Sequence, residues 1–274
     1  MAVIHLGEPR PVSPPRRFTL DVPGMLALQR ALDGDGLPAD IRVEVSEVSA
    51  QLAGVDLEQV VAEAADRLRA HGVLGADGAP IGPVAANLQG MSRAPRRIRT
   101  TYGGPVDTVL GYHWVGPELG GSLVRDGERF ELSMFDARSF GDELLRLLPG
   151  QTFAESDRRA MTLAVEDFAA LTAIEDEIVP GQVGPVADFL GLDPALLGAV
   201  HTWAEGFRGV LHCTASDTDE SRLPKALVWV CERTGWWSVV PLTRRDGTRT
   251  VTLTPREAKE ITADLGYLVS GAWT

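Results

Sequence analysis

Lysine, cysteine and asparagine are almost absent from this chain of 274 residues. The only lysines are Lys225 and Lys259, the only asparagine is Asn87, and arginine supplies the remaining positive side chains. This bias is typical of GC-rich coding and has no functional meaning alone. Acidic residues outnumber basic ones, and the net charge is −12. We therefore expect no nucleic-acid partner, because phosphate contacts need a concentrated basic surface.

The two cysteines, Cys213 and Cys231, both fall within expected strands. This usage fits buried thiols in a reducing cytosol better than a disulfide scaffold. Long hydrophobic runs are also missing, since no apolar stretch approaches the roughly 20 residues of a membrane span. Residues 1–17 are rich in proline and arginine and lack the apolar region of a signal peptide. We expect a soluble cytoplasmic protein without membrane insertion, with an arm over residues 1–17 and a single domain over 18–274.

Sequence motifs for catalysis are missing as well. The chain has no phosphate-binding glycine loop, nucleophile elbow or paired-histidine metal motif. Its nearest approach to a metal cluster is His201, His212, Cys213 and Cys231, whose spacing matches no zinc pattern. We therefore expect no catalytic residue, metal or cofactor. His113 and His212 leave an enzyme of unfamiliar type open, although a histidine without an orienting partner is usually structural.

What the chain does contain is a strand pattern in its first half. Glycine- and proline-rich turns separate the strands, and the last one alternates apolar and polar residues. The four expected strands are Arg96–Tyr102, Val106–Val115, Gly121–Arg125 and Arg129–Phe135. A helix is expected after a Ser139 cap, with Phe140, Leu144, Leu147 and Leu148 on its core face.

The second half repeats this plan. Its expected strands are Phe207–Thr214, Ala226–Glu232, Trp236–Leu242 and Thr250–Leu253. Thr254, Pro255 and Glu257 then predict a capped helix with Ala258, Ile261, Leu265 and Leu268 as its apolar stripe. The two pseudo-repeats cover about residues 18–150 and 151–274. A quasi-two-fold arrangement of strand meanders and a chance resemblance between two α+β lobes both stay open.

Further helices are expected around these strands. Phe18–Leu32 predicts a short helix that starts near Pro23, and Asp56 caps an amphipathic helix that Gly72 ends. A shorter helix is expected over Pro83–Gln89. Residues 153–203 predict three more, from Ser156, over Val183–Leu190 and over Pro194–Trp203. Acidic residues gather over 155–193, which marks either a partner surface or a solvated helical face.

A DNA-binding interpretation rests on two features. Residues Asp56–Gly78 resemble the start of a winged-helix module, and Arg93, Arg96, Arg97 and Arg99 form a basic cluster. The helix itself carries Glu58, Glu63 and Asp66, so it would face phosphates poorly. A winged-helix-like regulator therefore stays as the alternative function.

The tryptophans allow two roles. Trp229, Trp236 and Trp237 cluster around one turn, and Trp114 ends a strand in the other half. Tryptophan is enriched at protein interfaces, but core packing is its usual role. Trp236 and Trp237 are adjacent in one strand and must point to opposite faces. One of them is expected in the core, and the other is exposed or covered by a helix or a partner.

The order of these elements resembles the EspG family of cytosolic chaperones in actinobacterial type VII (ESX) secretion systems. The similar stretches are Phe18-Thr-Leu-Asp-Val with Leu26, Leu32 and Leu37-Pro38; Leu68-Arg-Ala-His-Gly-Val-Leu with Asp77-Gly78 and Val84-Ala85; and Trp236-Trp237-Ser-Val-Val-Pro241 with Leu253-Thr254-Pro255. The resemblance implies an α+β protein with a central, mainly antiparallel sheet, flanking helical bundles and internal quasi-symmetry.

The resemblance also implies a function without catalysis. Members of the family bind the helical tip of a secreted PE–PPE-type heterodimer and keep it soluble until export. Long helical hairpins expose an apolar tip that would otherwise self-associate, which gives this role a physical basis. A homodimer is open too, because an open sheet leaves edge strands to be covered.

The expected docking surface combines two glycine-rich turns with the helices around Val183–Trp203. Its candidate residues are Gly103, Gly104, Gly116, Leu119, Leu190, Leu192, Leu196, Leu197 and Trp203. The turns can adapt to a partner, and the leucines outnumber what a small helical pair needs for its own core. Leu197→Asp or Trp203→Ala would then weaken partner binding in a folded protein. If both residues are instead core, the substitutions would unfold the chain.

Overall fold

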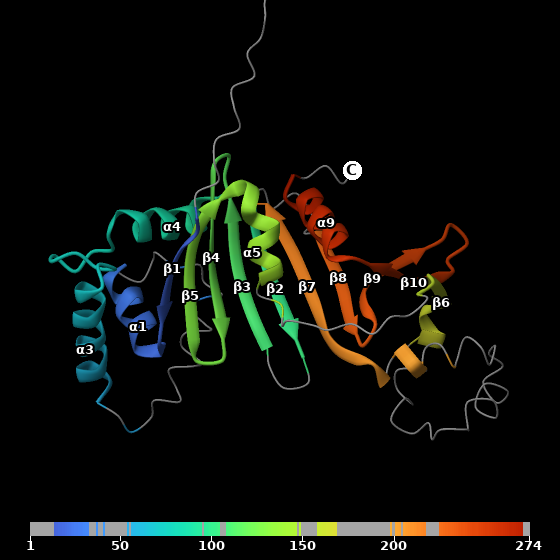
Figure 1. Cartoon of the computed structure of the whole chain (residues 1–274), viewed down its shortest axis with the longest axis horizontal. Helices are drawn as coiled ribbons and strands as arrows, with labels where there is room; N and C mark the ends of the chain where they lie inside the picture. The colour runs from blue at the N-terminus through green and yellow to red at the C-terminus, as the bar shows by residue number, and fades with distance from the viewer. Residues whose placement is uncertain are drawn as a thin grey trace, which may run out of the picture. The chain divides into compact units, whose positions relative to one another are not determined.

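We describe the fold from a computed structural model of residues 1–274. It describes residues 14–32, 37, 41, 54, 56–94, 96–104, 108–146, 148, 158–168, 198, 201–203, 205–217 and 225–270. Ten strands form one sheet in the order β1-β5-β4-β3-β2-β7-β8-β9-β10-β6. Figure 1 shows this sheet with helices packed on it, which confirms the predicted α+β class.

The strands keep the meander order expected from the sequence. They are β1 Arg16–Leu20, β2 Arg96–Gly103, β3 Thr108–Val115, β4 Leu119–Asp126, β5 Arg129–Asp136, β6 Met161–Ala164, β7 Phe207–Asp217, β8 Lys225–Glu232, β9 Gly235–Thr243 and β10 Arg249–Arg256. The described helices are α1 Val22–Ala31, α3 Leu57–Ala70, α4 Gly82–Arg93, the short 3-10 helix η2 Ala137–Ser139, α5 Phe140–Arg146 and α9 Ala258–Ser270. Within the described part of the chain, no helix has the length and apolar character to cross a membrane.

The chain divides into two compact units. Unit 1 comprises residues 1–97, 111–144 and 217–220, and unit 2 comprises residues 98–110, 145–216 and 221–274. Residues 98–110 therefore belong with the second half of the chain, although they lie in the first pseudo-repeat of the sequence pattern. Each unit has its own core.

In unit 1, strand β1 occupies residues that the sequence assigned to an arm and a helix. Arg16 to Leu20 pair antiparallel with β5, from Arg16 opposite Met134 to Leu20 opposite Phe130. The Arg17 guanidinium also contacts the Glu143 carboxylate at 2.5 Å. Pairing with an existing strand satisfies the backbone of this segment, so helix α1 begins only at Val22, after an Asp21 cap.

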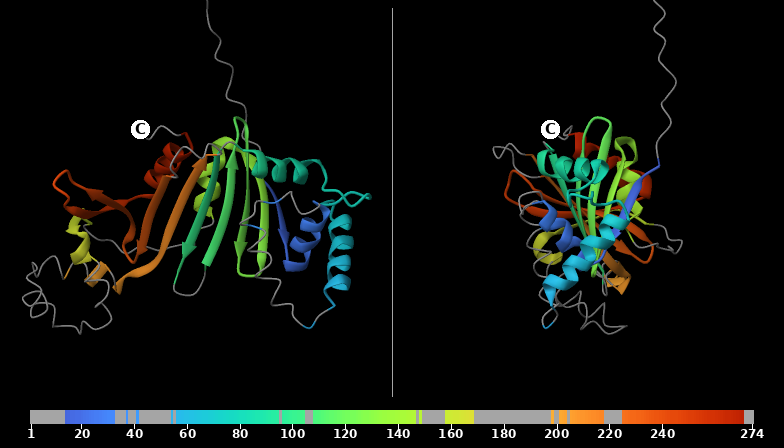
Figure 2. Two further views of the ribbon diagram at one scale, coloured as in Figure 1. Left: turned by 180° about the vertical axis from the view of Figure 1, so that it is seen from behind. Right: turned by 90° about the vertical axis from the view of Figure 1, so that its left-hand side faces the viewer.

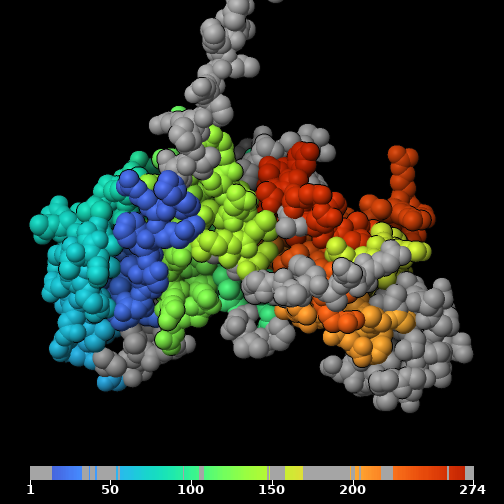
Figure 3. Space-filling model, in the orientation of Figure 1, coloured from blue at the N-terminus to red at the C-terminus, as the bar shows by residue number. Residues whose placement is uncertain are grey.

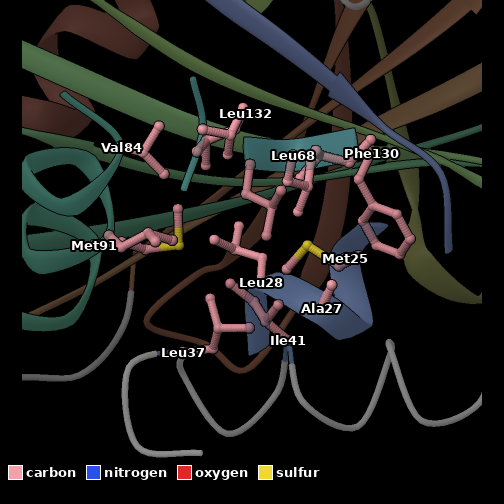
Figure 4. Close-up of a cluster of buried hydrophobic side chains, with 14 of the residues drawn as sticks. Met25, Ala27, Leu28, Leu37, Ile41, Leu68, Val84, Met91, Phe130 and Leu132 are labelled. Atoms are coloured by element: carbon pink, nitrogen blue, oxygen red, sulfur yellow. The ribbon is translucent and has the colours of Figure 1, made fainter. Parts of the chain in front are cut away.

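The core of unit 1 lies between the sheet and helices α1, α3 and α4. Met25 and Leu28 of α1 have no exposed side-chain surface, and Leu132 of β5 is 1% exposed. Figure 4 shows these side chains converging with Leu68 of α3 and Val84 of α4. The predicted cap of α3 is confirmed, because Asp56 Oδ1 accepts the Gln59 N–H at 3.2 Å. Helix α3 ends at Ala70, and Gly72 follows in the left-handed conformation with a φ of 67°.

In unit 2, the meander β7-β8-β9-β10 is antiparallel, and β6 adds an edge strand beside β10. The sequence predicted a helix from Ser156 in this region, but residues 161–164 pair with β10 instead. The helix predicted to begin at Thr254 is also placed wrongly. Thr254, Pro255 and Arg256 continue β10 opposite Ser238, Trp237 and Trp236, and α9 begins at Ala258.

Glu257 supplies the actual N-terminus of α9. Its N–H donates to Glu260 Oε2 at 2.8 Å, which is one half of a capping box. The predicted apolar stripe is confirmed at Ile261, Leu265 and Leu268, which are at most 2% exposed. Both views in Figure 2 show α9 along one face of the sheet.

The opposite face of unit 2 has a separate core. Its buried members are Leu163, Trp203, Val230, Trp237, Val251 and Leu253. Trp236 and Trp237 point to opposite faces, as expected, and both are buried. Trp236 meets Tyr102 edge-on at 6.4 Å, whereas the Trp237 indole N–H donates to buried Glu232 at 2.9 Å. Each face of β9 is therefore covered where these tryptophans lie.

Candidate partner-binding surface

The histidines and cysteines weighed as chemical groups form no metal-binding cluster among the described residues. His113 is buried and meets the Phe140 ring edge-on at 6.1 Å. Burial lowers the pKa of His113 to about 3, so this imidazole is neutral at physiological pH. His212 is exposed and its neighbour Cys213 is buried, so they point to opposite faces as predicted.

Both thiols are free, as the sequence predicted. Burial raises the pKa of Cys213 to about 12 and that of Cys231 to about 11. A thiol in this state is a poor nucleophile and a poor metal ligand at neutral pH. Among the described residues, no group of three or more histidines, cysteines or carboxylates is arranged to hold a metal ion.

The predicted docking residues fall into three sets. Gly103 and Gly104 lie at the end of β2 in unit 2, and Gly116 and Leu119 form the β3–β4 turn of unit 1. The Leu119 side chain is 49% exposed, as a docking residue requires. The role of these glycines and of Leu119 in partner binding stays a prediction.

For the helical part of the predicted surface, the structure differs more from the prediction. Leu190, Leu192, Leu196 and Leu197 lie outside the described residues. Trp203 is only 7% exposed and packs with Phe168 at a ring distance of 6.1 Å. Its indole belongs to the core beside Trp237 and Leu253. Trp203 therefore packs in this core, and its part in partner binding stays a prediction.

Another exposed apolar region lies on β9, at the edge of unit 2. Val240 is 49% exposed and Leu242 is 54% exposed. Residues two apart in a strand share a face, so both side chains point the same way. Thr252 and Thr250 of β10 lie directly opposite them, followed by Thr162 and Ala164 of β6. We call these six residues the outer strand face.

The outer strand face is apolar with a row of hydroxyl groups. Thr162 Oγ1 and Thr252 Oγ1 form a hydrogen bond at 3.2 Å. Thr250 is 8% exposed, and its buried hydroxyl has no hydrogen-bond partner among the described residues. A buried hydroxyl without a partner costs free energy, about 1 kcal/mol or more.

Arginines border the outer strand face at the β9–β10 turn. Arg244, Arg245 and Arg249 are exposed there, and Asp246 is the only acidic residue between Gly235 and Arg256. The Asp246 carboxylate is engaged within the turn, where it accepts the Thr248 N–H at 2.9 Å. Figure 3 shows this orange-red hairpin beside the yellow-green β6 segment. The turn is therefore locally positive in a chain with a net charge of −12.

Sequence reasoning missed the outer strand face for two reasons. The run from Trp236 to Leu242 is apolar at every position except Ser238, so no alternation marks the face on which Val240 and Leu242 are exposed. In addition, β6 was not recognised as a strand, so the position of β10 beside an edge strand was unknown. One signal was available: the arginines at 244, 245 and 249 place the end of this hairpin in water.

The DNA-binding alternative has little support in the geometry of α3. Arg67 contacts Asp21 at 2.9 Å, and Arg69 contacts Asp66 at 2.5 Å. These carboxylates would compete with phosphates for the arginine side chains. The segment after α3 forms a single isolated bridge, Leu74 to Pro80, before α4 begins. The described residues of this segment therefore lack the paired strands of a wing.

Comparison with known proteins gives a fold relationship. No protein-family model matches the chain, and no curated protein matches it. A solved structure that matches is that of the Mycobacterium tuberculosis type VII secretion system chaperone EspG5 in complex with the PE25–PPE41 dimer. The TM-score is 0.59 at 14% sequence identity, over 93% of this chain and 96% of that chain. The chain thus shares its fold with this chaperone over nearly the full length of both.

Proposed function

We propose that this chain is a specificity chaperone of a type VII secretion system. It binds a helical heterodimer of the PE–PPE type, keeps it soluble in the cytoplasm and delivers it for export. The observation that carries the proposal is the fold shared with EspG5, whose solved structure contains a PE25–PPE41 dimer. Because a fold can serve several functions, the surface chemistry has to support this role independently.

Two features of the surface support it. Large exposed hydrophobic side chains occur on both units, at Leu119 on unit 1 and at Val240 and Leu242 on unit 2. Exposed apolar groups beside a polar rim are typical of protein-binding surfaces. The groups considered for catalysis contribute little, since the His113 imidazole and both thiols are buried. Partner binding is therefore the role that these surfaces suit best.

Solubility in co-expression tests the proposal. Candidate PE–PPE-type pairs from the same genome are expressed with this chain and, separately, without it. The proposal predicts one pair that is largely insoluble alone and soluble with the chain, and that co-purifies with it. If every pair has the same solubility with and without the chain, the proposal is wrong.

A further inference from the structure

The outer strand face has the properties of a docking site for a helix. Val240 and Leu242 expose about half of their side-chain surface on one face of a paired strand. This face is at the free end of the sheet, since β6 is its last strand and is only four residues long. In Figure 1, α9 lies toward the β7–β8 part of the sheet, away from the β9–β10 hairpin. The two side chains are therefore open to a partner.

We propose that the outer strand face binds an amphipathic helix of the partner, with carboxylates beside the apolar stripe of that helix. This inference rests on the proposed function and assigns a surface and a helix chemistry to it. Val240 and Leu242 would contact the apolar stripe. Arg244, Arg245 and Arg249 would contact the carboxylates, because these cations are exposed at the adjoining turn.

Charge complementarity selects an acidic helix over a neutral one. Three arginines lie at the turn, Asp246 is the only acidic residue between Gly235 and Arg256, and its carboxylate accepts the Thr248 N–H. Glu166 of this chain follows β6. When the position of the partner is mapped, Glu166 has to be excluded as the carboxylate that contacts these arginines. Complementary charges at the rim of an interface accelerate association more than they raise affinity. Binding is therefore expected to weaken with salt and to lose that dependence when the arginines are reversed.

The test uses matched substitutions in the full chain and a PE–PPE-type pair that co-purifies with the wild type. Leu242→Asp is compared with Tyr267→Asp on α9, because both side chains are 54% exposed. Val240→Asp is compared with Phe207→Asp on β7, because these side chains are 49% and 41% exposed, and Leu119→Asp is measured as the competing candidate site. Thermal unfolding confirms that each variant is folded. Surface titration then measures affinity at two salt concentrations.

We expect Leu242→Asp and Val240→Asp to weaken binding about 30-fold, and the matched substitutions to change it less than about three-fold. Arg245→Glu with Arg249→Glu should slow association and remove most of the salt dependence. Unchanged binding by folded Val240 and Leu242 variants overturns this docking site alone. If only Leu119→Asp weakens binding, the β3–β4 turn is the site instead. A wild type that binds no pair overturns both this inference and the proposed function.

Discussion

The side-chain amide of Asn87 lies between Trp114 and Ser133 in the core of unit 1. The Trp114 indole N–H donates to Asn87 Oδ1 at 2.8 Å, and Asn87 Nδ2 donates to the Ser133 carbonyl oxygen at 2.7 Å. The only asparagine of the chain therefore joins helix α4 to strands β3 and β5. Asn87 is 2% exposed, so water cannot replace either hydrogen bond.

Replacing this asparagine should destabilise unit 1. Asn87→Leu keeps the side-chain size but leaves the buried Trp114 N–H without an acceptor. We expect the free energy of unfolding to fall by about 2–4 kcal/mol, since each buried group left unpaired costs about 1–3 kcal/mol. Urea unfolding measures the change. Gln89→Leu on the exposed side of the same helix is the control, and an equal loss there would contradict the assignment.

Gly121 of β4 makes this arrangement possible, because the absence of a side chain there leaves room for the Asn87 side chain of α4. A Cβ atom at Gly121 would lie 2.0 Å from Asn87 Oδ1 and 2.5 Å from Trp114 Nε1. Gly121→Ala is therefore expected to destabilise the fold by about 1–3 kcal/mol through overpacking. Gly103→Ala is the matched control, because a Cβ there meets nothing within 4 Å. Equal melting temperatures for the two variants would show that the core of unit 1 accommodates the added Cβ atom at Gly121 without loss of stability.

Trp203 should behave as a core residue in every assay. Trp203→Ala is expected to cost about 3–5 kcal/mol of unfolding free energy, because a large buried side chain is removed. Trp203→Phe should cost much less, since the buried Trp203 Nε1 has no hydrogen-bond partner among the described residues. Chemical unfolding of the two variants distinguishes them. If the Trp203→Ala protein were as stable as the wild type, Trp203 would be a surface residue and not a core residue.

The buried thiols predict a loss of stability in alkali. The pKa of Cys213 is about 12 and that of Cys231 about 11 in the fold, against about 8.5 in an unfolded chain. Below pH 8.5 both states hold the thiol protons, and above it the unfolded state releases them first. Stability should therefore fall from pH 8.5 to 10, by at most about 1.4 kcal/mol per pH unit for each thiol.

Cys213→Ala provides the comparison for this pH effect. Its stability can be lower at every pH, but the decline above pH 8.5 should be shallower than in the wild type. Urea unfolding at a series of pH values measures both slopes. Identical slopes would mean that Cys213 ionises as readily in the folded protein as in the unfolded chain.

Local patterns in the sequence were sufficient for the meanders and for most helices. The alternation in β5 and the apolar spacing in α3 and α9 directly reflect the side that faces the core. Ends that depend on pairing were harder to place. Thr254-Pro255 has the local pattern of a helix start, yet pairing with Ser238 and Trp237 keeps it in β10. Arg16 and Arg17 likewise join β1 only because β5 offers an unpaired edge.

The candidate surface was predictable only in part for the same reason. Leu119 could be placed in an exposed turn from its neighbouring glycines and proline, and it is exposed. Trp203 could not be assigned, because its burial depends on contacts with Phe168 and Trp237, which are distant in the chain. The exposure of Val240 and Leu242 depends on β6 as the last strand, which no local pattern indicates.

Binding between purified components tests the central proposal most directly. The chain is titrated into a purified PE–PPE-type heterodimer from the same genome, and the mass of the product is measured by light scattering during gel filtration. The proposal predicts a stable complex that contains this chain and the heterodimer, and no binding to unrelated helical dimers. Separate elution of the chain from every such heterodimer at micromolar concentration would contradict it.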